Sequence, residues 1–175
     1  MKLIIRKGKH RPAWWWLRWP IWYNKSTIGY KFQFSPNCEY DLRHADQDDT
    51  NKLFGIGYFP HHRLESARIG WRFDVIKRTI ILSAYAYVDG KRYIEEIMDN
   101  IVIDVEYIAV ILVANNKYIF RVASPDDHVT RIVSIPKQHN IKFAYPLGLY
   151  FGGNSGCPHR MHITMKNVII KRKRI

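Results

Sequence analysis

The sequence predicts an all-β fold, an antiparallel sandwich or barrel, on three observations. Apolar and polar residues alternate in several short segments, most clearly in residues 67–75, where the odd-numbered side chains are apolar; this period of two is typical of strands. Turn-forming pairs, Asp-Gly at residues 89–90 and Asn-Asn at residues 115–116, separate such segments. No helical pattern exceeds two turns, and residues 93–100 are the best helix candidate. Many short strands with closely spaced turns indicate a sandwich or barrel.

The expected strands follow one another with short connections, and the chain of 175 residues is expected to form a single domain, residues 1–175. Residues 79–88 are apolar on both faces, which indicates a central strand. Residues 100–107 also alternate, with Asp104 and Glu106 expected to face solvent. In chain order the strands are expected at residues 1–5, 28–34, 52–58, 67–75, 79–88, 91–97, 100–107, 109–114, 118–122, 130–135, 143–151 and 161–166.

Basic residues are concentrated at both ends of the chain, whose net charge is +13. Residues 1–38 contain eight Lys and Arg, residues 128–175 contain nine, and neither end contains an acid, so the ends carry +17 and residues 39–127 carry −4. This distribution favours a polyanionic partner near the termini, either an acidic glycan or nucleic acid, or an acidic protein surface. A soluble basic protein without such a partner has the same composition.

Five of the six tryptophans lie in residues 14–22. Because Trp is enriched in interface hot spots, residues 1–25 are predicted to be a basic docking segment for protein partners in an oligomer or larger assembly. The equal alternative is that these rings cover one end of the core. The docking residues are Trp14, Trp15, Trp16, Trp19 and Trp22. A basic tail, residues 171–175, ends the chain.

The apolar N-terminal run is not expected to be a signal peptide. Arg18 and Pro20 interrupt it, and no cleavage site with small residues follows. No apolar run reaches the roughly 20 residues of a membrane span. We therefore expect a cytoplasmic or virion location.

Two segments, residues 54–63 and 147–164, share the order Tyr-Phe, Pro-His, Arg. The glycines of residues 152–156 are expected to permit positive φ in a turn, and the residue before Pro158 is held extended. If the two segments are neighbours, their polar side chains form the rim of a binding site beside the concave face of a sheet. The candidate ligand-binding residues are His61, His62, Arg68, Arg72, Tyr85, Tyr87, Asn154, His159 and His162.

No catalytic, cofactor or metal signature accompanies these residues. Three of the histidines would suit zinc, but His61 and His62 are adjacent and point to opposite faces of an extended chain. We therefore predict no catalytic residue, no metal and no cofactor. Cys38 and Cys157 could form a disulfide, but we expect them to be free, buried thiols.

Residues 71–122 resemble the middle of a concanavalin A-like jelly roll, the sandwich of lectins, laminin-G-like domains and several polysaccharide lyases. The resemblance rests on the apolar strand and turn of residues 80–90, the segment 101–107 and the hairpin of residues 110–122. It implies that the first and last strands lie side by side in one sheet. Both acid-free ends would then contribute to one basic surface.

A second resemblance, to uncharacterised sandwich proteins of gut bacteria and their phages, rests on Tyr-Phe-Gly-Gly-Asn at residues 150–154, Pro-His at residues 158–159 and Gly-Trp-Arg at residues 70–72. On these grounds we expect a non-enzymatic, lectin-like sandwich that acts by binding or assembly, as a phage or mobile-element structural (virion) protein. The alternatives are a carbohydrate-binding protein and a lyase or hydrolase acting on acidic polysaccharide. For a lyase, Tyr85 or Tyr87 with arginines would supply the base and the charge neutraliser, although aromatic and Arg residues packed on a sandwich face give the same pattern.

Overall fold

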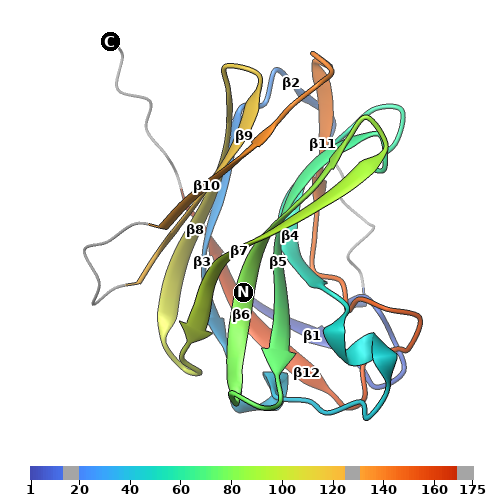
Figure 1. Cartoon of the computed structure of the whole chain (residues 1–175), viewed down its shortest axis with the longest axis vertical. Helices are drawn as coiled ribbons and strands as arrows, with labels where there is room; N and C mark the ends of the chain where they lie inside the picture. The colour runs from blue at the N-terminus through green and yellow to red at the C-terminus, as the bar shows by residue number, and fades with distance from the viewer. Residues whose placement is uncertain (14–19, 125–130, 169–175) are drawn as a thin grey trace.

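Two antiparallel sheets of six strands each pack face to face in a computed structural model that describes residues 1–13, 20–124 and 131–168 (Figure 1). The first sheet has the order β1-β12-β3-β8-β9-β10, and the second has the order β2-β11-β4-β5-β6-β7. The strands are β1 (Lys2–Ile5), β2 (Trp22–Tyr23), β3 (Thr27–Phe34), β4 (Asn51–Tyr58), β5 (Glu65–Asp74), β6 (Thr79–Val88), β7 (Lys91–Ile101), β8 (Glu106–Ala114), β9 (Lys117–Ala123), β10 (Arg131–Pro136), β11 (Phe143–Leu147) and β12 (Met161–Asn167).

The core lies between the sheets and is rich in aromatic side chains. Trp71 of β5 is fully buried there, and its ring lies 5.0 Å from that of Phe34 across the sandwich. Cys38 and Cys157 are free and buried, as expected. Two short 3-10 helices, η2 (Pro36–Cys38) and η3 (Ala45–Asp48), lie between β3 and β4. None of the helices in the described part of the chain is long and apolar enough to cross a membrane.

The sandwich confirms the predicted fold class, and several elements match closely. The predicted central strand is β6, which pairs with β5 on one side and β7 on the other. Both predicted hairpin turns are present: φ is 50° and 76° at Asp89 and Gly90, and 50° and 54° at Asn115 and Asn116. Positive φ at both central residues matches the twist of the flanking strands.

The helix candidate at residues 93–100 is wrong, because this segment belongs to β7. Its register against β6 shifts on both sides of Leu82. These irregularities let the strand bury Ile97 and Met98 in succession, and then Ile101. Burial at i, i+1 and i+4 imitates helical spacing, and an irregularity of this kind cannot be seen in one strand's sequence.

The strand expected at residues 100–107 is also wrong. Ile101 ends β7 in the second sheet and Glu106 begins β8 in the first sheet. Between them the backbone turns, with φ of 61° at Asp104. The alternating residues therefore belong to a connection between the two sheets. In this connection, residues facing the interior also alternate with residues facing solvent, so the pattern resembles that of a strand.

The first and last strands lie side by side, as the resemblance implies. β1 pairs antiparallel with β12, with Leu3 opposite Ile163. The ammonium of Met1 donates to the carbonyl of Met165 at 2.7 Å. The two acid-free ends are therefore joined in the first sheet through β1 and β12, while β2 and β11, which come from the same two ends, lie in the second sheet.

Most of the predicted docking segment lies outside the described residues, which exclude 14–19, and so does the tail 171–175. Trp22 is described and lies half-buried in β2, with the ammonium of Lys25 5.1 Å from its ring centre.

Candidate functional site: a basic pocket on the second sheet

The outer face of the second sheet, turned away from the core, carries a pocket of about 370 Å³. Its floor includes Lys52 of β4, Arg68 of β5 and Tyr85 of β6. We call this site the basic pocket. Its polar and aromatic lining residues are Arg11, Asp49, Lys52, His62, Arg63, Arg68, Tyr85, Tyr87, Arg92, Tyr150 and Asn154.

The two segments with the shared residue order meet at this pocket. β4 and β11 pair antiparallel, with Gly55 opposite Leu147. Beyond β11, the amides and carbonyls of Lys52 and Tyr150 exchange two hydrogen bonds of 2.8 Å. The loop of residues 59–64 after β4 supplies His62, and the segment after β11 supplies Tyr150 and Asn154. Neighbouring strands thus bring both rims of the pocket together.

The rim at Asn154 is held by η3. The carboxylate of Asp46 accepts hydrogen bonds from the backbone amides of Asn154 at 3.0 Å and Ser155 at 2.7 Å. Gly153 has φ of 71°, which confirms the predicted positive φ in this glycine-rich turn.

Gly55 makes room for the Arg68 side chain. A Cβ at this position would collide with the carbonyl oxygen of Ala67 and would lie 2.7 Å from Cγ of Arg68. Gly55→Ala is therefore expected to lower the free energy of unfolding by about 1–3 kcal/mol through overpacking. Thermal or denaturant unfolding measures this, and a variant as stable as the parent protein would contradict the close approach.

Arg68 is a buried cation without an anionic partner among the described residues. It is 9% exposed, and its Nη2 donates to the carbonyl of Gly148 at 3.2 Å. Its Nε is buried and has no hydrogen-bond partner in the described part of the structure. Burial lowers the pKa of Arg68, chiefly through loss of hydration. A guanidinium nevertheless stays charged at neutral pH.

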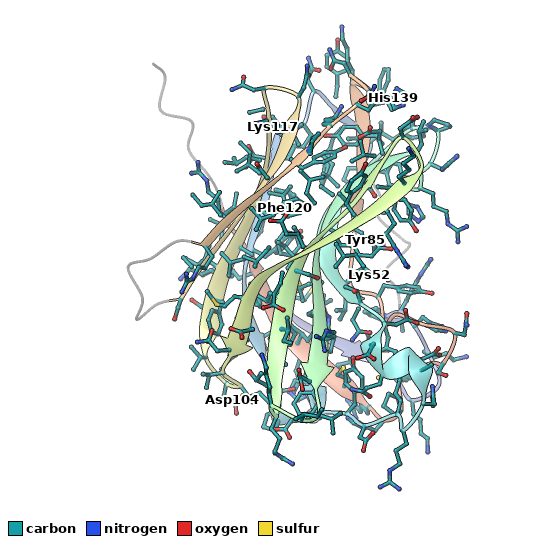
Figure 2. All side chains as sticks on the ribbon, in the orientation of Figure 1. Lys52, Tyr85, Asp104, Lys117, Phe120 and His139 are labelled. Carbon is teal, nitrogen blue, oxygen red and sulfur yellow. The ribbon has the colours of Figure 1, made fainter. Side chains whose placement is uncertain are left out.

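Lys52 adds a second cation beside it. Its ammonium lies 4.8 Å from the ring centre of Tyr85 and 5.7 Å from that of Tyr150 (Figure 2 shows Lys52 and Tyr85 next to one another). Burial, and then the charge of Arg68, lower the pKa of Lys52 to about 8. Among the described residues, Asp49 is the one carboxylate that lines the pocket. The pocket is consequently rich in positive charge that the described residues leave largely uncompensated.

Two further groups of the pocket, His62 and Tyr85, are neutral at physiological pH. Burial, followed by the charges of Arg68 and Arg63, lowers the pKa of His62 to about 4. Burial raises the pKa of Tyr85 to about 12, and the Tyr85 hydroxyl donates to that of Tyr87 at 3.5 Å. The pocket therefore combines the unprotonated imidazole of His62 with the protonated phenol of Tyr85.

The structure brings five of the sequence-predicted site residues together in this pocket, and it places four elsewhere. The five that share the pocket are His62, Arg68, Tyr85, Tyr87 and Asn154. His61 is exposed and does not line it. Arg72 lies four residues after Arg68 on the same strand face, and its Nη1 is 3.8 Å from Asp74 and 3.9 Å from Asp48.

His159 and His162 lie at a different place, around Asn37 of η2. The Nε2 of His159 is 2.9 Å from the Asn37 carbonyl oxygen, and the Nδ1 of His162 is 2.8 Å from the Asn37 side-chain amide. Their separation from the pocket follows from topology, because His162 belongs to β12 in the first sheet.

Sequence reasoning missed several pocket residues. They are Arg11, Lys52, Arg63, Arg92 and Tyr150. The ring of Tyr150 stacks on His10 at 5.2 Å and 14°, and the guanidinium of Arg11 lies 5.4 Å from its ring centre. One signal was available, since Tyr150 begins the Tyr-Phe pair of the second shared segment.

The two sheets and their strand order define a lectin-like β-sandwich, the concanavalin A-like fold that residues 71–122 resemble. No protein-family model matches the chain, and no curated protein matches it. Solved structures do match, at sequence identities that show the fold alone.

One similar structure is an alginate lyase from Klebsiella pneumoniae, with a TM-score of 0.59 and 9% identity over 82% of this chain and 59% of that one. A functionally unknown protein from Saccharomyces cerevisiae has a TM-score of 0.57 and 9% identity over 96% of this chain and 89% of that one. An exolytic alginate lyase from Zobellia galactanivorans has a TM-score of 0.50 and 11% identity over 87% of this chain and 77% of that one. The chain thus spans less than two thirds of the Klebsiella protein.

Proposed function

We propose that the protein binds an acidic polysaccharide in the basic pocket. The observation that carries this proposal is Arg68, a guanidinium that is 9% exposed and has no ion pair within the described residues. A buried charge without a partner costs several kcal/mol of stability. An anion bound in the pocket would offset that cost, and Lys52 would add a second positive charge at the same place.

The size and the aromatic walls of the pocket favour a carbohydrate anion over a bare inorganic ion. About 370 Å³ is within the range of roughly 300–1,000 Å³ that small-molecule sites occupy. Tyr85, Tyr87 and Tyr150 offer ring faces and hydroxyls beside the cations. Two of the similar solved structures are named alginate lyases, so this fold is used by proteins that act on an acidic polysaccharide.

The direct test is calorimetric titration with alginate, polygalacturonate and hyaluronan, and with a neutral dextran as the control. We expect the acidic polymers to bind and the affinity to fall as salt is added, since exposed charges are screened over about 10 Å at 0.1 M ionic strength. Equal binding of dextran, or no binding of any acidic polymer, would overturn the proposal.

A second candidate function is cleavage of the bound polysaccharide by β-elimination, which the protonation states of the pocket favour. Neutral His62 would remove the proton next to the uronate carboxylate, and Arg68 or Lys52 would neutralise the carboxylate. The Tyr85 hydroxyl would give its proton to the leaving oxygen as the carbon–oxygen bond breaks and a carbon–carbon double bond forms. Each of these groups has the protonation state that its step requires at neutral pH.

The ultraviolet absorbance of unsaturated product measures this reaction. His62→Ala is expected to lower the rate about 10²–10⁴-fold, as loss of a general base does. His61→Ala, at the exposed neighbouring position, is the matched control and should leave the rate unchanged. The pKa of His62 is about 4, so its imidazole stays unprotonated between pH 7 and pH 5. Protonation of this base should therefore not lower the rate in that range. Binding without product would restrict the function to recognition.

The assembly role expected from the Trp-rich segment, with a virion location, remains a prediction, because residues 14–19 lie outside the described residues. Nucleic acid as a partner and the resemblance to phage proteins also remain predictions. The oligomeric state of the native protein, compared with a variant carrying Ala at Trp14, Trp15, Trp16 and Trp19, tests this role. A monomer without a partner would contradict it.

A further inference from the structure

A second hollow lies at another part of the sandwich, between the start of β3, the β8–β9 hairpin and the connection from β10 to β11. Its volume is about 190 Å³, and we call it the end pocket. The residues that the argument uses are Lys25, Lys137, Asn115, Asn116, Asn140 and Tyr58. In Figure 2, Lys117 and His139, which adjoin the hairpin and the β10–β11 connection, lie at the end of the molecule opposite Asp104.

Main-chain hydrogen bonds hold the walls of the end pocket together. The amide of Val113 donates to the carbonyl of Ser26 at 2.7 Å, which joins the hairpin to the start of β3. The amide of Lys137 donates to the carbonyl of Asn116 at 2.8 Å, which joins the same hairpin to the β10–β11 connection. The shape of the end pocket is therefore fixed by backbone contacts among the three segments.

The lining is cationic and rich in amides. Two lysines and four asparagines line the end pocket, and no carboxylate does so among the described residues. Neither Lys25 nor Lys137 makes an ion pair within the described part of the chain. A side-chain amide both donates and accepts hydrogen bonds, so it suits hydroxyl groups, whereas an ammonium only donates.

Contact with a buried tyrosine ring holds Lys137 in place. Its ammonium lies 4.9 Å from the ring centre of Tyr58, a residue that is 2% exposed. The fully buried carboxylate of Glu65, whose charge acts on both Tyr58 and Lys137, accepts hydrogen bonds from the Tyr118 hydroxyl at 2.5 Å and from the amide of Gln138 at 3.1 Å. Burial lowers the pKa of Lys137, and the charge of Glu65 opposes this change. The cation is thus partly dehydrated and already positioned before any ligand arrives.

We propose that the end pocket is a second binding site, which takes a small hydroxylated carboxylate of the size of one acidic sugar. The lysines would bind the carboxylate and the asparagine amides would bind the hydroxyls. The end pocket has about half the volume of the basic pocket, 190 against 370 Å³, which favours a single sugar residue over a chain. This proposal stands independently of the function of the basic pocket.

The test is a titration of isotope-labelled protein with sodium glucuronate, followed by the amide signals in nuclear magnetic resonance spectra. Signals of Asn115, Asn116 and Asn140 are expected to shift and to saturate. Glucose, which lacks the carboxylate, is expected to bind at least about tenfold more weakly, because it loses the hydrogen bonds to a charged group. Acetate keeps the carboxylate but lacks the hydroxyls, and it is also expected to bind at least about tenfold more weakly, because it loses several neutral hydrogen bonds to the asparagine amides.

Lys137→Met and Lys25→Met are each expected to weaken glucuronate binding at least about tenfold for the same reason. Lys25 is exposed, so its variant keeps the test valid if Lys137→Met unfolds. Lys117→Met is the matched control, an exposed lysine next to Asn116 that does not line the pocket, and it should bind as the parent does. Shifts confined to the basic pocket, equal binding of glucose, or full affinity in both lysine variants would overturn the proposal.

Discussion

Arg68→Met is expected to weaken binding of acidic polysaccharide about ten- to a hundredfold, while the unliganded protein becomes equally or more stable. The loss of affinity follows from removing a charged hydrogen-bond donor, worth about 1.5–3 kcal/mol, from the floor of the basic pocket. The gain in stability follows because Arg68 is buried with an unpartnered Nε. Replacing a buried ion by an apolar residue of similar volume is often neutral or stabilising. Calorimetric titration and denaturant unfolding of the same preparation measure the two effects.

Arg72→Met provides the matched control for this prediction. Arg72 lies on the same strand face, but it does not line the pocket and has Asp74 and Asp48 within 4 Å. Its removal should change the affinity by no more than about twofold, as substitutions away from a site usually do. If Arg68→Met bound as tightly as the parent, or if Arg72→Met weakened binding equally, Arg68 would not be the residue that holds the anion.

Binding is expected to weaken as the pH rises from 7 to 9, by up to about tenfold, because Lys52 loses its proton in this range. The pKa of Lys52 is about 8 in the folded protein, against 10.5 for an ordinary lysine. A bound carboxylate favours the charged ammonium, so binding above pH 8 requires uptake of a proton. Uronate carboxylates stay ionised throughout this range. The affinity measured across the range should therefore follow the titration of Lys52.

The stability of the unliganded protein should change with the opposite sign. Below pH 8 Lys52 is protonated in both the folded and the unfolded state, and the cost of burying the charge is fully present. Between pH 8 and about pH 10.5 the unfolded state binds more protons at this residue, so its contribution to stability rises with pH. Lys52→Met should remove both pH effects, and Lys52→Arg should retain binding with a flat profile, since arginine stays charged. A slope that persisted in both variants would assign the titration to another group.

The fold class could be predicted from the sequence because its strongest signals are local. The hairpin turns at residues 89–90 and 115–116 require positive φ, which Asp, Asn and Gly tolerate. β6 could be recognised as central because both of its faces are apolar. The helix candidate at residues 93–100 failed for a non-local reason, since the burial pattern of β7 depends on its irregular register against β6.

Five of the eleven polar and aromatic pocket residues could be predicted from the sequence, for a related reason. Arg68 and Tyr85 alternate with core residues on regular strands, so their shared outward face follows from the period of two. Lys52 could not be placed in this way, because the register of β4 against β5 shifts between Lys52 and Phe54. This shift changes which face of the sheet the residues on either side of it point to. His162 follows the Pro-His pair as the sequence suggests, but β12 joins the first sheet, away from the basic pocket.

The most direct test of the central claim compares one polymer with and without its charge. Polygalacturonate and its fully methyl-esterified form have the same sugar rings, but only the first offers carboxylates to Arg68 and Lys52. We predict that calorimetry at low salt detects binding of polygalacturonate with an affinity that falls as salt is added, and none of the ester. Equal affinity for the two polymers would contradict recognition of charge, and the basic pocket would then have no role as an acidic-glycan site.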